Sequence, residues 1–164
     1  MRWRTAIAML LGLLGAAGCA ERADTSVDHV DADVVFNQEM ITHHQQTIRL
    51  AEVAAERGES SYVRDLSKKL IAEEKADIAM MSSWLRSWRE PVPPEPATQP
   101  GADIPAGPGF DRKWLATLSG HLEHGVHMAE TVKKTGRHGP TLELADAITK
   151  AQRAELADVA GRAG

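Results

Sequence analysis

Residues 36–51, FNQEMITHHQQTIRLA, have a counterpart 78 positions later in residues 114–129, WLATLSGHLEHGVHMA. This shift places His43 on His121 and keeps the apolar and small residues of the two segments in step. The same shift aligns the turn and the helical segment that follow, as five pairs: Gly58 with Gly136, Leu66 with Leu144, Leu70 with Ile148, Glu74 with Gln152, and Asp77 with Glu155. One constant shift over two helical segments and their turn indicates an internal duplication.

Helix-like periodicity begins at about residue 33 and returns in three further segments, which start near residues 61, 111 and 140. Gly58 and Gly136 end the first and third segments, and Pro140 suits the first position of the fourth. Each pair of helices has an apolar face that only the other pair can cover. The sequence therefore predicts an all-α four-helix bundle over residues 33–161, made of repeat one (33–89), a linker (90–109) and repeat two (110–161). The linker holds seven of the eight prolines, which excludes a helix there and makes it a crossover.

The N-terminus has the features of an export signal. Arg2 and Arg4 precede a short apolar stretch at residues 6–18, which leads directly to Cys19, the only cysteine. The segment GAAGC resembles the lipobox of bacterial lipoproteins, although Ala16 stands where a larger aliphatic residue is usual. We therefore expect a lipoprotein signal peptide at residues 1–18, a lipid on Cys19 and a polar tether at 19–32. The protein would be exported and held on the outer face of a cell membrane, or in the periplasm; an ordinary secretory signal with an incidental cysteine is the alternative.

The composition excludes several classes of function. A length of 164 residues suits one domain, and a net charge of −4 without a basic block beyond the N-terminus argues against nucleic acid as a partner. The chain has no G-x-S-x-G nucleophile elbow and no glycine-rich phosphate loop.

Histidine and methionine side chains gather on single helix faces. At 100° per residue, Met40, His43 and His44 fall within an arc of about 100°. The second repeat has a tighter stripe of about 60°, made of His121, His124 and Met128. On the helix that begins near residue 61, Asp77 and Met81 are further candidates, and they share one face with Glu74. His29 and His138 are interpreted as solvated surface residues.

Such a set of side chains favours copper, above all cuprous copper. Imidazole and thioether are neutral donors and softer than carboxylate, so they select copper over magnesium or calcium. Thioethers also avoid the disulfide chemistry that thiols undergo outside the cytosol. The alternative is structural, because methionine at helical spacing often fills gaps in a core, and two adjacent histidines cannot point the same way.

The patterns F-x3-M-I-x-H-H-x3-I-x2-A, at residues 36–51, and L-x3-L-I-x2-E-x2-D-I-x2-M, at 66–81, resemble the bacterial domain-of-unknown-function 305 family. The resemblance covers about residues 33–159 and implies a ferritin-like helical bundle in an exported protein. Some members bind copper through methionine and histidine and contribute to copper tolerance. The family motif falls on Met40, His43 and His44 in the first helix, and on Asp77 and Met81 in the second.

The second repeat departs from the family pattern. His121 is kept, but Leu118 and Leu122 replace the leading methionine and the second histidine. Three nearby side chains could make up the loss: His124, His127 and Met128.

Three functions follow as hypotheses. The first is a copper-binding lipoprotein that sequesters the metal without catalysis, through Met40, His43, His44, Asp77, Met81, His121, His124 and Met128. The second is a metal-free structural or interaction lipoprotein of the cell envelope. The third is a di-iron oxidoreductase, which is disfavoured because no glutamate in the chain has a histidine three residues later.

Overall fold

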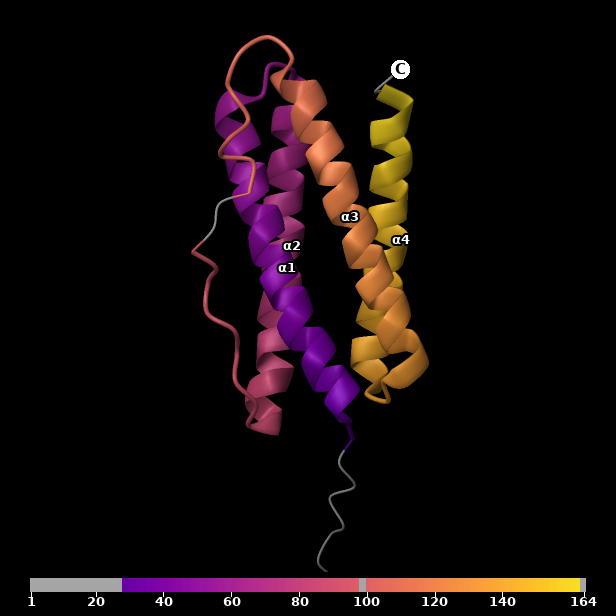
Figure 1. The fold of residues 1–164 in the computed structure, drawn as a ribbon. Helices are drawn as coiled ribbons and strands as arrows, with labels where there is room; N and C mark the ends of the chain where they lie inside the picture. Colours follow the sequence, from indigo (N-terminus) through magenta and orange to yellow (C-terminus); the bar gives the residue numbers. More distant parts are fainter. Residues whose placement is uncertain (1–27, 98–99, 163–164) are drawn as a thin grey trace, which may run out of the picture.

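The computed structural model describes residues 28–97 and 100–162. This part of the chain forms four helices and no strand, which confirms the predicted all-α bundle (Figure 1). The helices are α1 (Asp31–Arg57), α2 (Ser61–Trp88), α3 (Phe110–Thr135) and α4 (Gly139–Arg162). The predicted signal peptide and the lipidation site at Cys19 lie outside the described residues.

The four helices are arranged as two antiparallel hairpins, α1–α2 and α3–α4, which meet mainly along α1 and α3 (Figure 1). The proline-rich connection runs in extended form beside α1 and returns the chain to the opposite end of the bundle. Three side chains of α1 hold it there. Gln38 donates to the carbonyl of Pro91 at 3.0 Å, and Arg49 pairs with Glu95 at 2.8 Å. Arg57 donates to the carbonyls of Ala102 and Ile104 at 3.1 and 2.8 Å.

Two aspartates join the hairpins end to end. The carboxylate of Asp33, in the first turn of α1, accepts from the backbone N–H groups of Arg137 and His138 in the α3–α4 turn. The carboxylate of Asp111 in α3 accepts from the backbone N–H groups of Glu59 and Ser60, in the α1–α2 turn. The two sets of hydrogen bonds therefore correspond at the shift of 78 residues. Each carboxylate pairs backbone N–H groups near the start of a helix, which the helix itself leaves without acceptors.

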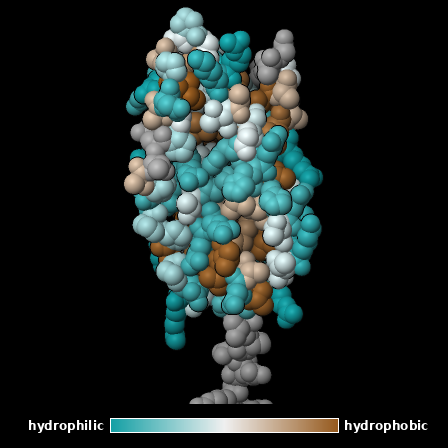
Figure 2. All heavy atoms as spheres, viewed as in Figure 1, coloured by the Kyte–Doolittle hydropathy of each residue, from teal (hydrophilic) through white to brown (hydrophobic). Residues whose placement is uncertain are grey.

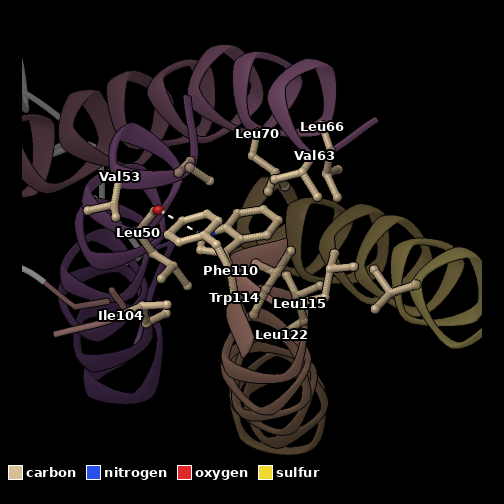
Figure 3. Close-up of a cluster of buried hydrophobic side chains, with 14 residues drawn as sticks. Leu50, Val53, Val63, Leu66, Leu70, Ile104, Phe110, Trp114, Leu115 and Leu122 are labelled. Atoms are coloured by element: carbon tan, nitrogen blue, oxygen red, sulfur yellow. Dashed lines mark hydrogen bonds between the residues drawn. The ribbon is translucent and has the colours of Figure 1, made fainter. Parts of the chain in front are cut away.

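The core consists of two apolar clusters, one toward each end of the described bundle. The Trp114 cluster includes Leu50, Val53, Val63, Leu66, Leu70, Phe110, Leu115, Leu118 and Leu122, and Trp114 Nε1 donates to the carbonyl of Leu50 at 2.8 Å (Figure 3). The Met40 cluster includes Phe36, Ile41, Met81, Leu85, Ala129, Val132, Leu144 and Ile148. Buried polar side chains from the middle of the helices belong to neither cluster, and they include His43 and His44 of the predicted site.

The surface is mainly hydrophilic. Figure 2 shows polar residues across the middle of the face that it draws, with smaller apolar patches between them. Among the described residues, the large hydrophobic side chains that stand well exposed are Val35 and Met80. None of the four helices is both long enough and apolar enough to span a membrane.

The interpretation of His138 as a solvated residue is wrong. Only 6% of it is exposed, and its Nδ1 accepts from the backbone N–H of Thr141 at the start of α4. Its ring packs edge-on against Trp84 and Trp88, with ring centres 5.2 and 4.8 Å away. His29 stacks on Trp88 at 4.2 Å and is partly covered. Neither contact could be read from local sequence, because tertiary packing creates both.

Candidate metal centre

The middle of the bundle holds a layer of buried polar side chains from all four helices. Helix α1 supplies His43, His44 and Thr47, which are 3%, 1% and 0% exposed. The other helices supply the buried Glu74 from α2 and Gln152 from α4, together with the partly buried Asp77 from α2 and His121 from α3. Such a layer costs stability unless its polar atoms are paired, so its contacts indicate what it is for.

His43 and His121 form the contact between the two hairpins in this layer. Their rings stack with centres 3.9 Å apart and planes 6° apart. Nε2 of His43 lies 3.0 Å from the carbonyl oxygen of His121, and Nε2 of His121 lies 3.2 Å from that of His43. The hydroxyl of Thr47 is a second neighbour of His121 Nε2, at 3.0 Å. The stack is therefore reciprocal across the interface of α1 and α3.

Gly125 makes room for His43. A Cβ atom at this position would lie 2.8 Å from Cε1 of His43 and would also collide with the amide of Gln152. A side chain on α3 at this point would therefore push the imidazole or the amide away. The small residue allows helix α3 to approach the ring closely.

His43 is held as a neutral imidazole. Burial, and then the neighbouring His121, lower its pKa to about 3. A neutral ring carries one N–H and one lone pair, and Nε2 takes the proton because it faces a carbonyl oxygen. Nδ1 is then the lone-pair nitrogen. It is buried and has no hydrogen-bond partner among the described residues.

His44 has the opposite state. Its Nδ1 forms an ion pair with Glu74 Oε2, and its Nε2 lies 3.5 Å from Asp77 Oδ2. Burial lowers the pKa of His44, but the charges of Glu74 and Asp77 outweigh this effect and raise it to about 9. His44 is therefore an imidazolium with a carboxylate at each nitrogen. Both ring nitrogens therefore face a carboxylate, and the protonated ring has no free lone pair for a metal ion.

The predicted methionine ligands lie in two places. Met40 and Met81 are both fully buried and pack in the Met40 cluster. Met128 is partly buried, packs against that cluster and lines a surface groove beside α1 and α3. His124 lines the same groove, and its ring centre is 5.7 Å from that of His43.

The predicted donors thus fall into three groups. The first group is His43 with His121 and His124, and the second is His44 with Asp77. The third consists of Met40 and Met81, which share an apolar cluster, and Met128, which packs against it. Within the described ranges, no three His, Cys, Asp or Glu side chains are arranged to hold one metal ion. A site built from His43 would therefore need thioether sulfur among its donors.

Sequence reasoning did not include Glu74 and Gln152 in the predicted site. Both are buried in the polar layer, at 5% and 6% exposure. Glu74 shares a helix face with Asp77, and Gln152 is its counterpart at the shift of 78, so both signals were present in the sequence. Asp77 is in the predicted site and Glu74 is not, because the acidic residue of the family motif falls on Asp77.

Comparison with known proteins gives one family and several similar structures. The family described as "Domain of unknown function (DUF305)" matches residues 33–106 and 101–161. The Cu(I)-bound form of CopM is 27% identical, with a TM-score of 0.70 over 79% of this chain and 93% of that chain. The silver-bound form of CopM from co-crystallisation gives the same values. A DUF305 fragment from Deinococcus radiodurans is 24% identical, with a TM-score of 0.69 over 82% of this chain and 97% of its own, and shows a common fold. Among curated protein sequences, none matches this one.

Proposed function

Because the chain belongs to the DUF305 family, whose members include a protein with copper-bound and silver-bound structures, we propose that it binds copper outside the cytoplasm and sequesters it. The observation that carries the proposal is the state of His43. A neutral imidazole with a buried, unpartnered lone pair at Nδ1 costs stability in a protein that makes no use of it.

The proposed donor set is His43 with Met40, His124 and Met128. Two imidazoles that bind one ion through nitrogens at about 2.0–2.1 Å have ring centres roughly 5–6 Å apart, and the His43 and His124 rings are 5.7 Å apart. Met40 lies in the Met40 cluster, and Met128 packs against the same cluster. Imidazole and thioether together suit cuprous copper and silver better than harder ions.

Three other predicted ligands have secondary roles in this proposal. His121 holds the His43 ring by stacking and fixes its tautomer through its carbonyl oxygen. His44 and Asp77 form an ion pair, so His44 would bind a metal only after it loses its proton. Met81 belongs to the same apolar cluster as Met40 and would be a further thioether if that cluster opens.

We also propose that the protein is exported and anchored by a lipid on Cys19. The support is the sequence of residues 1–19, with two arginines, an apolar stretch and a single cysteine. Globomycin, which blocks cleavage of lipoprotein signals, should cause a larger precursor to accumulate. A Cys19→Ser variant should not respond to the drug, and an unchanged pattern for the wild-type protein would contradict lipidation.

The copper proposal is tested by competition with a chromogenic Cu(I) chelator under anaerobic conditions. Wild-type protein should remove Cu(I) from the chelator, and His43→Ala should lower the affinity on the order of 10–100-fold or more. His29→Ala is the matched control, because His29 stacks on Trp88 away from the polar layer. Equal Cu(I) affinity in the His43→Ala and wild-type proteins would overturn the assignment.

The second candidate is a metal-free structural lipoprotein. It is favoured by His121 and His44, whose ring nitrogens already contact protein groups. In that case the polar layer fixes the register of the two hairpins and binds nothing. Thermal unfolding separates the candidates, since a metal that binds only the folded state must raise Tm.

A further inference from the structure

Gln152 of α4 meets His43 of α1 at the surface of α3. A Cβ atom on Gly125 would collide with Oε1 of Gln152 and would lie 2.8 Å from Cε1 of His43. The amide oxygen and the imidazole therefore reach the same point on α3 from two different helices. Gln152 is 6% exposed and His43 is 3% exposed, so this meeting point lies in the interior of the bundle.

Both groups present lone pairs that have no donor within the described ranges. Oε1 of Gln152 is buried and unpaired, and so is Nδ1 of His43, the ring atom next to Cε1. An amide oxygen can only accept, and Nδ1 of this neutral ring also carries only a lone pair, so neither atom can donate to the other. Two buried acceptors in one place are costly, because each loses its water without gaining a donor. A cation between them would satisfy both.

The internal repeat shows why the amide oxygen is unpaired. Gln152 is the counterpart of Glu74 at the shift of 78 residues, and Glu74 pairs with His44. The counterpart of His44 is Leu122, whose side chain has no N–H group. Gln152 therefore lacks the imidazole partner that Glu74 has. An amide also offers an acceptor oxygen without the charge of a carboxylate, so it does not favour protonation of a neighbouring ring.

From this convergence we propose that Gln152 Oε1 is an oxygen donor to the metal ion held at His43. The inference rests on the proposed function and adds a residue of α4 to the donors from α1 and α3. Imidazole and thioether alone favour Cu(I) and Ag⁺, whereas Cu(II) is harder and accepts an additional oxygen, as in copper sites with an axial glutamine. Gln152 therefore contributes mainly to the binding of Cu(II).

The test measures the affinities for Cu(II) and for Ag⁺ separately, by competition with chelators on the purified metal-free protein. Gln152→Leu removes the oxygen and keeps a side chain of similar size. Gln45→Leu is the matched control: Gln45 also has a buried Oε1 without a partner among the described residues, but it lines a groove between α1 and α2 with Lys75 and Ile78. His43→Ala tests the metal centre itself.

Gln152→Leu should lower the Cu(II) affinity about tenfold or more and the Ag⁺ affinity less than about threefold, because a soft ion gains little from an amide oxygen. The Cu(II) EPR spectrum should change in Gln152→Leu and stay the same in Gln45→Leu. Without metal, Gln152→Leu should have the Tm of the wild type or a higher one, since it removes an unpaired buried acceptor. His43→Ala should weaken the binding of both ions.

Three results would overturn the role of Gln152. Unchanged Cu(II) affinity in Gln152→Leu would mean that a water molecule, and not the ion, pairs the amide oxygen. Tighter Cu(II) binding would mean that the amide donates to His43 and competes with the metal. A lower Tm with equal losses of Ag⁺ and Cu(II) would mean that Gln152 only packs. If His43→Ala binds both ions as tightly as the wild type, the proposed function itself fails, so the two failures are distinguishable.

Discussion

At the scale of single residues, two adjacent histidines have opposite protonation states. His43 faces another histidine and a carbonyl oxygen, and His44 faces two carboxylates. Burial disfavours the charged form of both, so the difference comes from their neighbours. Adjacent positions on a helix point about 100° apart, which is how one dipeptide reaches two environments.

The state of His44 predicts a pH dependence of stability. Its folded-state pKa is about 9, above the ordinary value of 6.5, so its stabilising effect is complete below pH 6.5 and is lost as the pH rises to about 9. The free energy of unfolding should fall on the order of 2–3 kcal/mol across this window. Urea denaturation between pH 6 and 9 measures the fall.

The control for this experiment is the double variant His44→Gln/Glu74→Gln, which removes the buried charge pair together. Its stability should change little between pH 6.5 and 9. His43 does not interfere, because its lowered pKa of about 3 makes its contribution vary only below pH 6.5. A wild-type protein with constant stability across the window would contradict the charged state of His44.

Gly125 offers a second test at this scale. Gly125→Ala should destabilise the protein by about 1–3 kcal/mol, since the new methyl group would press on His43 Cε1 and on Gln152. Gly120→Ala is the matched control, because nothing lies within 4 Å of a Cβ there, and it should stabilise the helix by about 0.5–1 kcal/mol. Guanidinium denaturation of both variants gives the comparison, and equal effects would contradict the close packing of His43 on α3.

At the scale of helices, each hairpin is fastened to the other by an aspartate in the first turn of α1 or α3. The two fastenings differ in burial, since Asp33 is fully buried and Asp111 is partly exposed. The pairing of contacts at a separation of 78 residues, at both ends and at the His43–His121 stack, supports the proposed internal duplication.

The two aspartates should therefore contribute unequally to stability. Asp33→Ala leaves the buried N–H of His138 and the partly buried N–H of Arg137 without an acceptor and should cost on the order of 2–4 kcal/mol. Asp111→Ala should cost about 1 kcal/mol, because water can replace the carboxylate there. Asp31→Ala, in the same first turn of α1 but exposed, is the control and should stay within about 0.3–1 kcal/mol of the wild type. In urea denaturation, Asp33→Ala should therefore lower the free energy of unfolding more than Asp111→Ala does. The reverse order would contradict the difference in burial.

At the scale of the whole molecule, the amino-acid pattern predicted the four helices, their turns and the crossover, because these depend on periodicity, glycine and proline. The helix ends in the structure lie within two residues of the positions that the sequence predicts. The environments of the histidines could not be predicted in this way. They depend on which residues of another helix lie opposite, as with Glu74 beside His44 and the carbonyl of His121 beside His43.

Copper should stabilise the whole bundle. His43 joins α1 to α3, so an ion held by His43 and His124 would tie the two hairpins together. With Cu(I) at 100 times its Kd, the gain is about 2.7 kcal/mol, which calorimetry would detect as a rise in Tm. His43→Ala should show no such rise, and a Tm of the wild type that is indifferent to Cu(I) would favour the metal-free alternative.

The most direct test of the central claim is a long-range ¹H–¹⁵N NMR spectrum of the histidine rings, recorded during titration with Ag⁺ as a redox-inert substitute for Cu(I). We predict that the His43 Nδ1 resonance moves in proportion to bound metal while His43 Nε2 keeps its proton. Metal binding that leaves the His43 Nδ1 resonance unchanged would contradict the proposed centre.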